Sequence, residues 1–149
     1  IEQYEKLAGD YGFTIDAVAV TAQAEVTQAV DKLLADRVDC FSNLTDNNVV
    51  GVLPAILEKT DEAGIPVYGS EVEQVKMGCV AAAGIDYIAL GRQTGEMAAR
   101  ILKGEATASE MDYETITEYG IYINSDALAA MGITVPQEIA DRAIESTAE

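Results

Sequence analysis

The fold of this protein follows from residues 38–71, whose sequence is VDCFSNLTDNNVVGVLPAILEKTDEAGIPVYGSE. Short apolar runs at its two ends, Val38–Leu44 and Ile65–Gly69, have the length and residue types of buried strands. Between them one helical stripe is expected, which Pro54 should kink or confine to one side and Gly64 should end; its members are Val49, Val52, Leu53, Ile56 and Leu57. A strand, a helix and a strand in this order predict two parallel strands joined by a crossover helix.

The segments outside this unit continue the alternation. Short runs of small or β-branched apolar residues predict three more strands, at Thr14–Val20, Cys79–Ala83 and Thr115–Ile123. Helical periodicity and capping residues predict helices at Ile1–Ala8, at Glu25–Asp36, from Tyr87 to Gly104, after Asn124 or Ser125, and from Pro136 to Ile144. Strands that alternate with helices predict an α/β fold, a three-layer sandwich with a mainly parallel sheet.

Composition limits the possible partners. The chain of 149 residues has the size of one domain, and its 26 acidic against 9 basic residues give a formal net charge of −17. Such a charge disfavours nucleic acid and anionic membrane surfaces as partners. The longest apolar run, Val49–Leu57, is interrupted by Gly51 and Pro54 and is too short to span a membrane. Cys40 and Cys79 are expected to be buried, inert thiols, with a disulfide between them as the alternative.

Catalytic and metal-binding patterns are missing from the sequence. It contains no histidine, no Gly-x-Gly-x-x-Gly, no Gly-x-x-x-x-Gly-Lys and no Gly-x-Ser-x-Gly. The usual general base of a triad and the usual ligands of structural zinc are therefore lacking. We expect a protein that is not an enzyme and that has no metal ion or other cofactor.

Polar residues instead follow three successive predicted strands, at Asn43–Asn47, Gly69–Glu71 and Gly84–Tyr87. Ligands of open parallel sheets bind at the carboxyl ends of the strands, so these residues predict one binding crevice. Carboxylates there suit an ammonium group, and hydroxyls suit an anionic group. Asp, Asn and Ser are also common helix caps, which is an alternative interpretation of each loop taken singly.

Beyond these generic features, a series of motifs is distinctive. Thr45-Asp46-Asn47-Asn48-Val49-Val50 is followed by Ala63 to Glu71, by Gly84-Ile85-Asp86-Tyr87 with Leu90 to Thr94, by Ile101 to Gly104, and by Ile123 to Pro136. In this order they closely resemble the ABC-transporter substrate-binding family whose best-known members bind tryptophan or related aromatic amino acids. The resemblance covers nearly the whole chain.

The resemblance implies a type I periplasmic-binding-protein fold, in which two lobes close on a ligand. Residues 1–83 would be the second lobe without its first strand, 84–111 the hinge crossing and a helix of the first lobe, and 112–149 the return strand and C-terminal helices. The chain would thus be a C-terminal fragment whose sheet lacks a central strand and leaves backbone groups unpaired. The implied ligand contacts are Asn43, Thr45, Asp46, Asn47, Ser70, Glu71 and Asp86.

The function implied is the extracytoplasmic, periplasmic or lipid-anchored, solute-binding component of an ABC importer. Its partners would be a small molecule, expected to be an amino acid, and the membrane permease. An alternative is a ligand-sensing domain of a transcription regulator or receptor with the same fold. A phospho-receiver domain is disfavoured because the Thr14–Val20 run continues into Thr21 and Ala22 rather than into an acidic pair.

Overall fold

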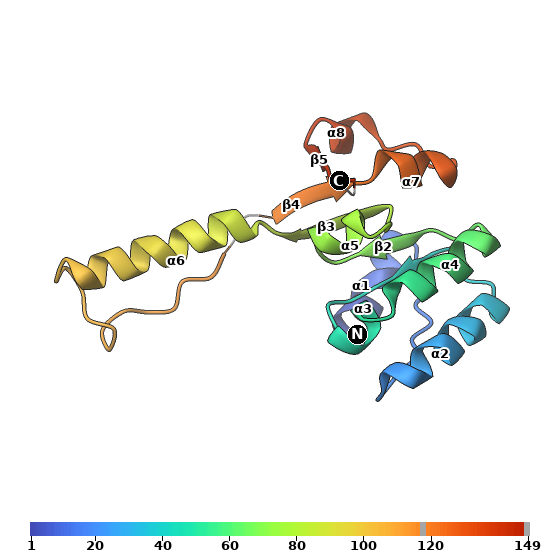
Figure 1. Ribbon diagram of the computed structural model, residues 1–149, viewed down its shortest axis with the longest axis horizontal. Coiled ribbons are helices and arrows are strands. Elements are labelled where there is room, and N and C mark those ends of the chain that lie inside the picture. The colour runs from blue at the N-terminus through green and yellow to red at the C-terminus, as the bar shows by residue number, and fades with distance from the viewer. Residues whose placement is uncertain (117–118, 148–149) are drawn as a thin grey trace.

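A computed structural model describes residues 1–116 and 119–147 and confirms the α/β fold (Figure 1). Within these residues, five strands form one sheet in the order β1 (Phe41–Ser42), β2 (Val67–Gly69), β3 (Ala81–Ile85), β4 (Tyr119–Ile123) and β5 (Ala143–Glu145). Strands β1, β2 and β3 are mutually parallel, β4 runs antiparallel to β3, and β5 pairs parallel with β4. The sheet is therefore mostly parallel, as expected from the sequence.

Most helices lie close to where the sequence predicts them. They are α1 (Glu2–Ala8), α2 (Gln23–Ala35), α3 (Asn47–Val50), α4 (Leu53–Ala63), α5 (Val72–Lys76), α6 (Tyr87–Leu102), α7 (Ser125–Ala130) and α8 (Gln137–Ala140), with a 3₁₀ turn, η1 (Gly9–Tyr11), after α1. The expected kink near Pro54 is a complete break between α3 and α4. Pro54 lies in the first turn of α4, where its missing N–H costs nothing.

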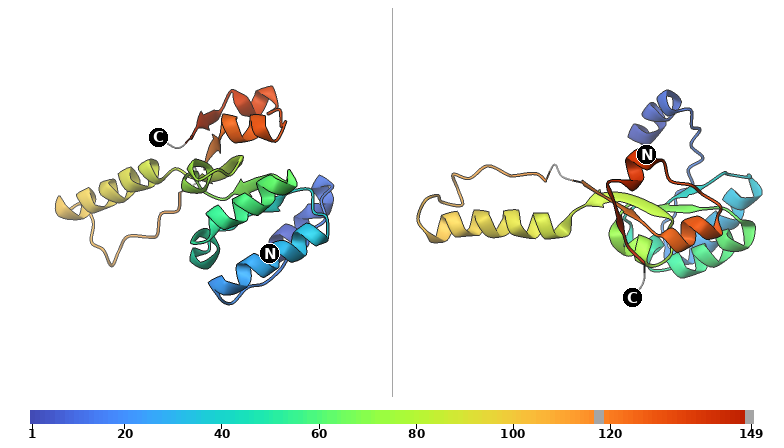
Figure 2. Two further views of the ribbon diagram at one scale, coloured as in Figure 1. Left: turned by 45° about the vertical axis from the view of Figure 1, so that its right-hand side comes forward. Right: turned by 90° about the horizontal axis from the view of Figure 1, so that it is seen from above.

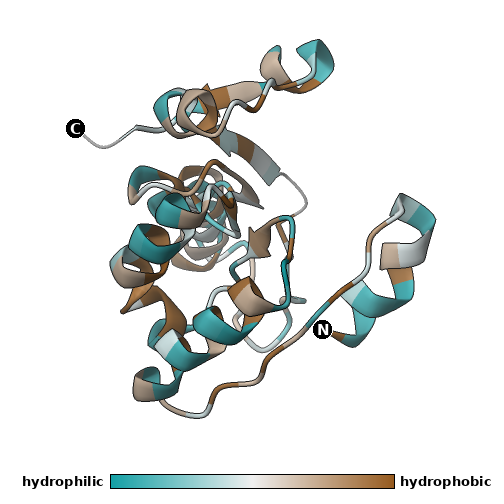
Figure 3. Cartoon of the chain, turned by 90° about the vertical axis from the view of Figure 1, so that its right-hand side faces the viewer, coloured by the Kyte–Doolittle hydropathy of each residue, from teal (hydrophilic) through white to brown (hydrophobic). Residues whose placement is uncertain are grey.

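The main core lies between α2, α4 and the parallel strands. Its buried members are Val26, Val30, Leu53, Ile56, Leu57, Val67 and Cys79. A smaller cluster joins Val75 of α5 to Ala82 and Tyr122 in the centre of the sheet. The N-terminal helix stands apart from these helices and is joined to them by an extended segment (Figure 3).

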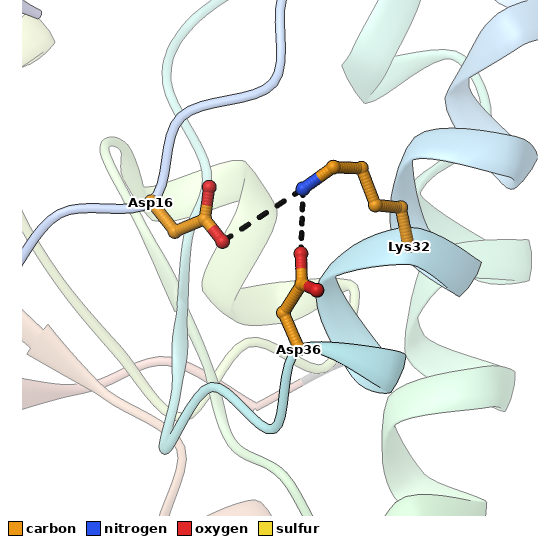
Figure 4. A network of polar contacts seen from close by, with 3 residues as sticks. All are labelled: Asp16, Lys32 and Asp36. Atoms are coloured by element: carbon orange, nitrogen blue, oxygen red, sulfur yellow. Dashed lines mark hydrogen bonds and ion pairs between the residues drawn. The ribbon is translucent and has the colours of Figure 1, made fainter.

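The expected strand at Thr14–Val20 is wrong. These residues are extended but belong to no strand. A strand needs a hydrogen-bonded neighbour. Within the described residues, β1 at the edge of the sheet pairs only with β2, so the segment at Thr14–Val20 does not extend the sheet. The extended segment is tied instead to α2, because Lys32 contacts both Asp16, at 3.9 Å, and Asp36, at 2.5 Å (Figure 4). The hydrogen bond from Lys32 also lowers the pKa of Asp36.

Three further expectations need correction. Of the strand predicted at Val38–Leu44, only Phe41 and Ser42 pair in the sheet. The last helix stops at Ala140 rather than Ile144, because residues 143–145 pair with β4 and supply its second neighbour. Cys79 is buried, which raises the pKa of its thiol to about 12, but Cys40 is exposed. Both thiols are free.

Helix α6 projects away from the rest of the molecule (Figures 1 and 2). It has no buried residue, and its Ile88 and Leu102 side chains are 79% and 87% exposed. The return segment is held along it by Glu114, which accepts hydrogen bonds from Gln93 and Arg100. Within residues 1–116 and 119–147, no helix is long and apolar enough to cross a membrane.

We predict that Leu53→Ala lowers the free energy of unfolding by about 2–5 kcal/mol. Leu53, the first residue of α4, is completely buried in the core that α4 forms with α2 and β2. Leu7→Ala on α1 is the control, since that side chain is half exposed and should change stability by less than about 1 kcal/mol. Urea denaturation followed by circular dichroism measures both. Equal midpoints for the two variants would contradict the assigned core.

Candidate functional site

The carboxyl ends of β1, β2 and β3 meet at one edge of the sheet. The backbone N–H of Asn43, just after β1, donates to the carbonyl of Tyr68 in β2 at 2.8 Å. Further out, the hydroxyls of Thr45 and Ser70 are hydrogen-bonded at 2.8 Å. The loop after β2 also contacts β3, since a Cβ added to Gly84 would lie 2.8 Å from the Ser70 carbonyl oxygen. The three predicted polar loops are therefore adjacent.

A buried glutamine, Gln74 of α5, connects two of these loops beneath the surface. Its Oε1 accepts from the Asn43 side-chain amide at 3.2 Å and from the Ser70 backbone N–H at 3.1 Å. Its Nε2 donates to the Ser70 hydroxyl at 3.4 Å. Gln74 was not among the residues predicted from the sequence. A polar residue on the inward face of a short helix, directly after a polar loop, was the available signal.

Asp46 and Asp86 both cap helices. Oδ1 of Asp46 accepts from the backbone N–H groups of Asn48 and Val49, at the start of α3. Oδ1 of Asp86 does the same for α6, with its acceptor bonds at 2.9 and 3.0 Å. The capping interpretation thus holds for both residues. It does not exclude ligand binding, because each cap uses one of the two carboxylate oxygens.

Glu71 and Asn47 differ from the two aspartates. Glu71 occupies the cap position of α5, but its side chain makes no capping bond and is half-buried. Asn47 is the exposed first residue of α3. Of the predicted residues, Asn43 is the buried one, at the base of the loop. The six others lie outward from it, on or near the surface.

Tyr122 of β4 is a second residue that the sequence analysis missed. It is buried in the smaller cluster, and its ring lies over Gly120, where an added Cβ would be 2.6 Å from the phenol oxygen. Burial, with a smaller contribution from the nearby charge of Asp86, raises the pKa of Tyr122. The phenol is therefore neutral at physiological pH and lies within electrostatic range of the loop after β3.

Two cavities lie away from these loops. One, of about 370 Å³, is between α6 and its return segment, lined by Glu96, Ala99, Arg100, Lys103 and Glu114. The other, of about 330 Å³, is lined by Leu57, Asp61, Gly64, Val67, Gly78, Val80, Ala127, Ala130 and Met131. Neither contains a predicted site residue. Thr45, Asp46 and Asn47 are exposed, and Ser70, Glu71 and Asp86 are half-buried, so these residues form a polar surface that suits one wall of a binding site closed by a second wall.

We predict that Gly84→Ala destabilises the protein by about 1–3 kcal/mol, because the added methyl group would meet the backbone of Ser70 and Glu71, which cannot rotate away. Gly91→Ala, inside α6 with no atom within 4 Å of the new methyl, should instead stabilise by about 0.5–1 kcal/mol. Thermal unfolding compares the two. A neutral Gly84→Ala would contradict the close approach of the loops.

Curated and solved relatives resemble this chain. A tyrosine-binding protein of Clostridioides difficile (strain R20291) is 34% identical over 112 residues, which are 75% of this chain and 32% of the relative. A ligand-free, open substrate-binding protein with adhesive properties from Clostridium difficile has a TM-score of 0.77 and 30% identity, over 99% of this chain and 49% of that one.

Two more solved structures share the fold. An ABC domain from Streptococcus pneumoniae in complex with L-Trp has a TM-score of 0.81 and 26% identity, over 97% of this chain and 48% of that one. A conserved domain protein from Vibrio cholerae O1 biovar El Tor has a TM-score of 0.80 and 27% identity, over 98% of this chain and 48% of that one. The chain thus spans about half the length of these solved structures and about a third of the curated relative.

The family model described as ABC transporter substrate binding protein matches residues 1–147, almost the entire chain. The match agrees with the architecture, since polar loops meet at the carboxyl ends of parallel strands. It is also a family of binding proteins rather than of enzymes. The chain belongs to the ABC transporter substrate-binding protein family.

Proposed function

We propose that this chain works within a two-lobed protein that captures an amino acid outside the cytoplasmic membrane and delivers it to the permease of an ABC importer. The observation that carries the proposal is the convergence of the three strand-end loops, marked by the hydrogen bond between Thr45 and Ser70. The curated relative that binds tyrosine and the solved relative that holds L-Trp favour an aromatic amino acid.

The chemistry of the surface suits a zwitterion. The carboxylates of Asp46, Glu71 and Asp86 would accept from the ammonium group, and the hydroxyl of Thr45, hydrogen-bonded to that of Ser70, would donate to the carboxylate. Hydrogen bonds to charged groups contribute roughly 1.5–3 kcal/mol each. Two or three of them, with burial of the ligand's ring, suffice for a micromolar complex of about −8 kcal/mol. Asn43 and Asn47 would complete the contact set from the loop after β1.

We further propose that residues 1–83 belong to the second lobe, that 84–111 cross the hinge and add α6 to the first lobe, and that 112–149 return to complete the second. The exposed apolar side chains of α6 support this division, because Ile88 and Leu102 would be buried against the first lobe. At the crossing, Gly84 of β3 pairs with Gly120 of β4, a position without side chains in either strand.

The second lobe would gain one strand from the rest of the protein. The free edge of β1 and the unpaired segment at Thr14–Val20 support this, because a strand between them would satisfy the backbone groups of both. Ligand capture then works by closure of the lobes. The open form exposes the polar surface, and contacts that the ligand makes with both lobes favour the closed form.

We predict that Asp46→Asn and Glu71→Gln each weaken binding of L-tyrosine or L-tryptophan to the two-lobed protein more than tenfold. Both changes remove a charge at constant size, and Asn keeps the cap of α3. Isothermal titration calorimetry measures the affinity. Glu62→Gln near the end of α4 is the control, since it changes the net charge equally, away from the strand ends.

The outcomes separate two parts of the proposal. Wild-type affinity in both Asp46→Asn and Glu71→Gln would refute the site. No heat of binding from the wild-type protein with any amino acid, aromatic ones included, would remove the amino acid as ligand. Circular dichroism should show an unchanged fold in every variant, because none of the three replaced side chains is buried.

A further inference from the structure

We propose that Gln74 sets the direction of the hydrogen bonds at the strand ends, so that Thr45 presents its hydroxyl proton to the ligand. The group bound at Thr45 is then an acceptor, the carboxylate of the amino acid. This inference rests on the proposed function and deepens it, because it assigns one end of the ligand to one residue. Gln74 acts as a positioning residue, since its buried side chain does not reach the surface.

The orientation of the Gln74 amide follows from its neighbours. The Ser70 backbone N–H is only a donor, so the side-chain atom 3.1 Å from it must be the oxygen. The Asn43 amide nitrogen, which donates to the same oxygen, agrees with this assignment. A flipped amide would place donor against donor in a site with no exposure to water, which is costly. The Gln74 nitrogen therefore faces the Ser70 hydroxyl and donates to it.

The direction of the hydrogen bonds continues from Ser70 to Thr45. Ser70 is half-buried, and within the part of the chain that the structure describes its hydroxyl oxygen has Gln74 and Thr45 as partners. Because the Gln74 nitrogen can only donate, it occupies one lone pair of the Ser70 hydroxyl, and we infer that the Ser70 proton is donated to Thr45, the acceptor 2.8 Å away. Thr45 is exposed, so its own proton is directed outward, where a ligand or water can accept it.

The packing around Gln74 holds this arrangement in place. A Cβ on Gly69 would lie 2.9 Å from Cβ of Gln74 and 3.0 Å from its Oε1, so a glycine is needed for the amide to sit against the end of β2. Gln74 is completely buried, and buried polar groups are held by their hydrogen bonds. The Ser70 hydroxyl therefore faces a fixed donor rather than mobile water.

Reversing the direction provides the test. In Gln74→Glu the side chain can only accept when ionised, so the Ser70 proton turns toward it and Thr45 donates to Ser70. The lone pairs of Thr45 then face the ligand carboxylate. We expect binding of L-tyrosine to weaken about tenfold or more, the order of one charge-assisted hydrogen bond. Tyramine, with the same ring and ammonium group but no carboxylate, should lose less than about threefold.

A double-mutant cycle excludes a general structural effect. Thr45→Val removes the hydroxyl proton that Gln74 and Ser70 direct toward the ligand. Thr45→Ser keeps this proton and should retain affinity within about threefold. If Gln74 acts through Thr45, then Gln74→Glu adds little to the loss already caused by Thr45→Val. Gln137→Glu is the matched control, because among residues 1–116 and 119–147 the Gln137 side chain is hydrogen-bonded to its helix neighbour Asp141, and the change should leave binding unchanged.

Calorimetry of the two-lobed protein with L-tyrosine and tyramine decides between the outcomes. Non-additive losses in the cycle, confined to the ligand that has a carboxylate, support the proposal that Gln74 acts through Thr45. Equal losses for both ligands, additive losses in the cycle, or an unchanged Gln74→Glu variant overturn it while the proposed function stands. If Gln74→Glu does not fold, Thr45→Val alone must still discriminate between the two ligands. A wild-type protein that binds no amino acid overturns both proposals.

Discussion

The candidate site depends on the parallel pairing of β1, β2 and β3. Parallel strands bring their carboxyl ends to one edge, so the loops after β1 and β2 meet within hydrogen-bonding distance and Gly84 of β3 lies against the backbone of Ser70. An antiparallel partner in this position would send alternate loops to opposite edges and separate them. Strand β4, the antiparallel neighbour of β3, runs back toward the C-terminal helices and brings no loop of the predicted set.

The strand ends approach one another closely because two glycines leave room for their neighbours. Gly84 admits the backbone of the loop after β2, and Gly69 admits Gln74. The resulting network is neutral, although the chain as a whole carries a formal charge of −17. The carboxylates lie at the surface, where two of them cap helices. A neutral buried layer beneath charged caps avoids the large desolvation cost of burying an unpaired charge.

The helix that projects from this assembly has a different role. Helix α6 has apolar side chains but no partner to cover them within the described residues, so its stability depends on its own hydrogen bonds and on contacts of the return segment. Gly91 and Gly95 lie inside this helix, and glycine lowers the stability of an isolated helix by about 1 kcal/mol per residue relative to alanine. The first lobe, to which we propose that α6 belongs, would bury these side chains, and the same contact would bring the second wall over the strand-end loops.

The sequence by itself determined the α/β alternation between residues 38 and 130, most helix positions and the polar loops, because these depend on local periodicity and on caps such as Asp46 and Asn124. It left open whether the aspartates cap helices or bind a ligand, since both uses need the same residue at the same place. Tertiary structure alone decided that Thr14–Val20 stays unpaired, that residues 143–145 form a strand, and that Gln74 joins two loops. Each of these depends on partners distant in the sequence, which no local pattern specifies.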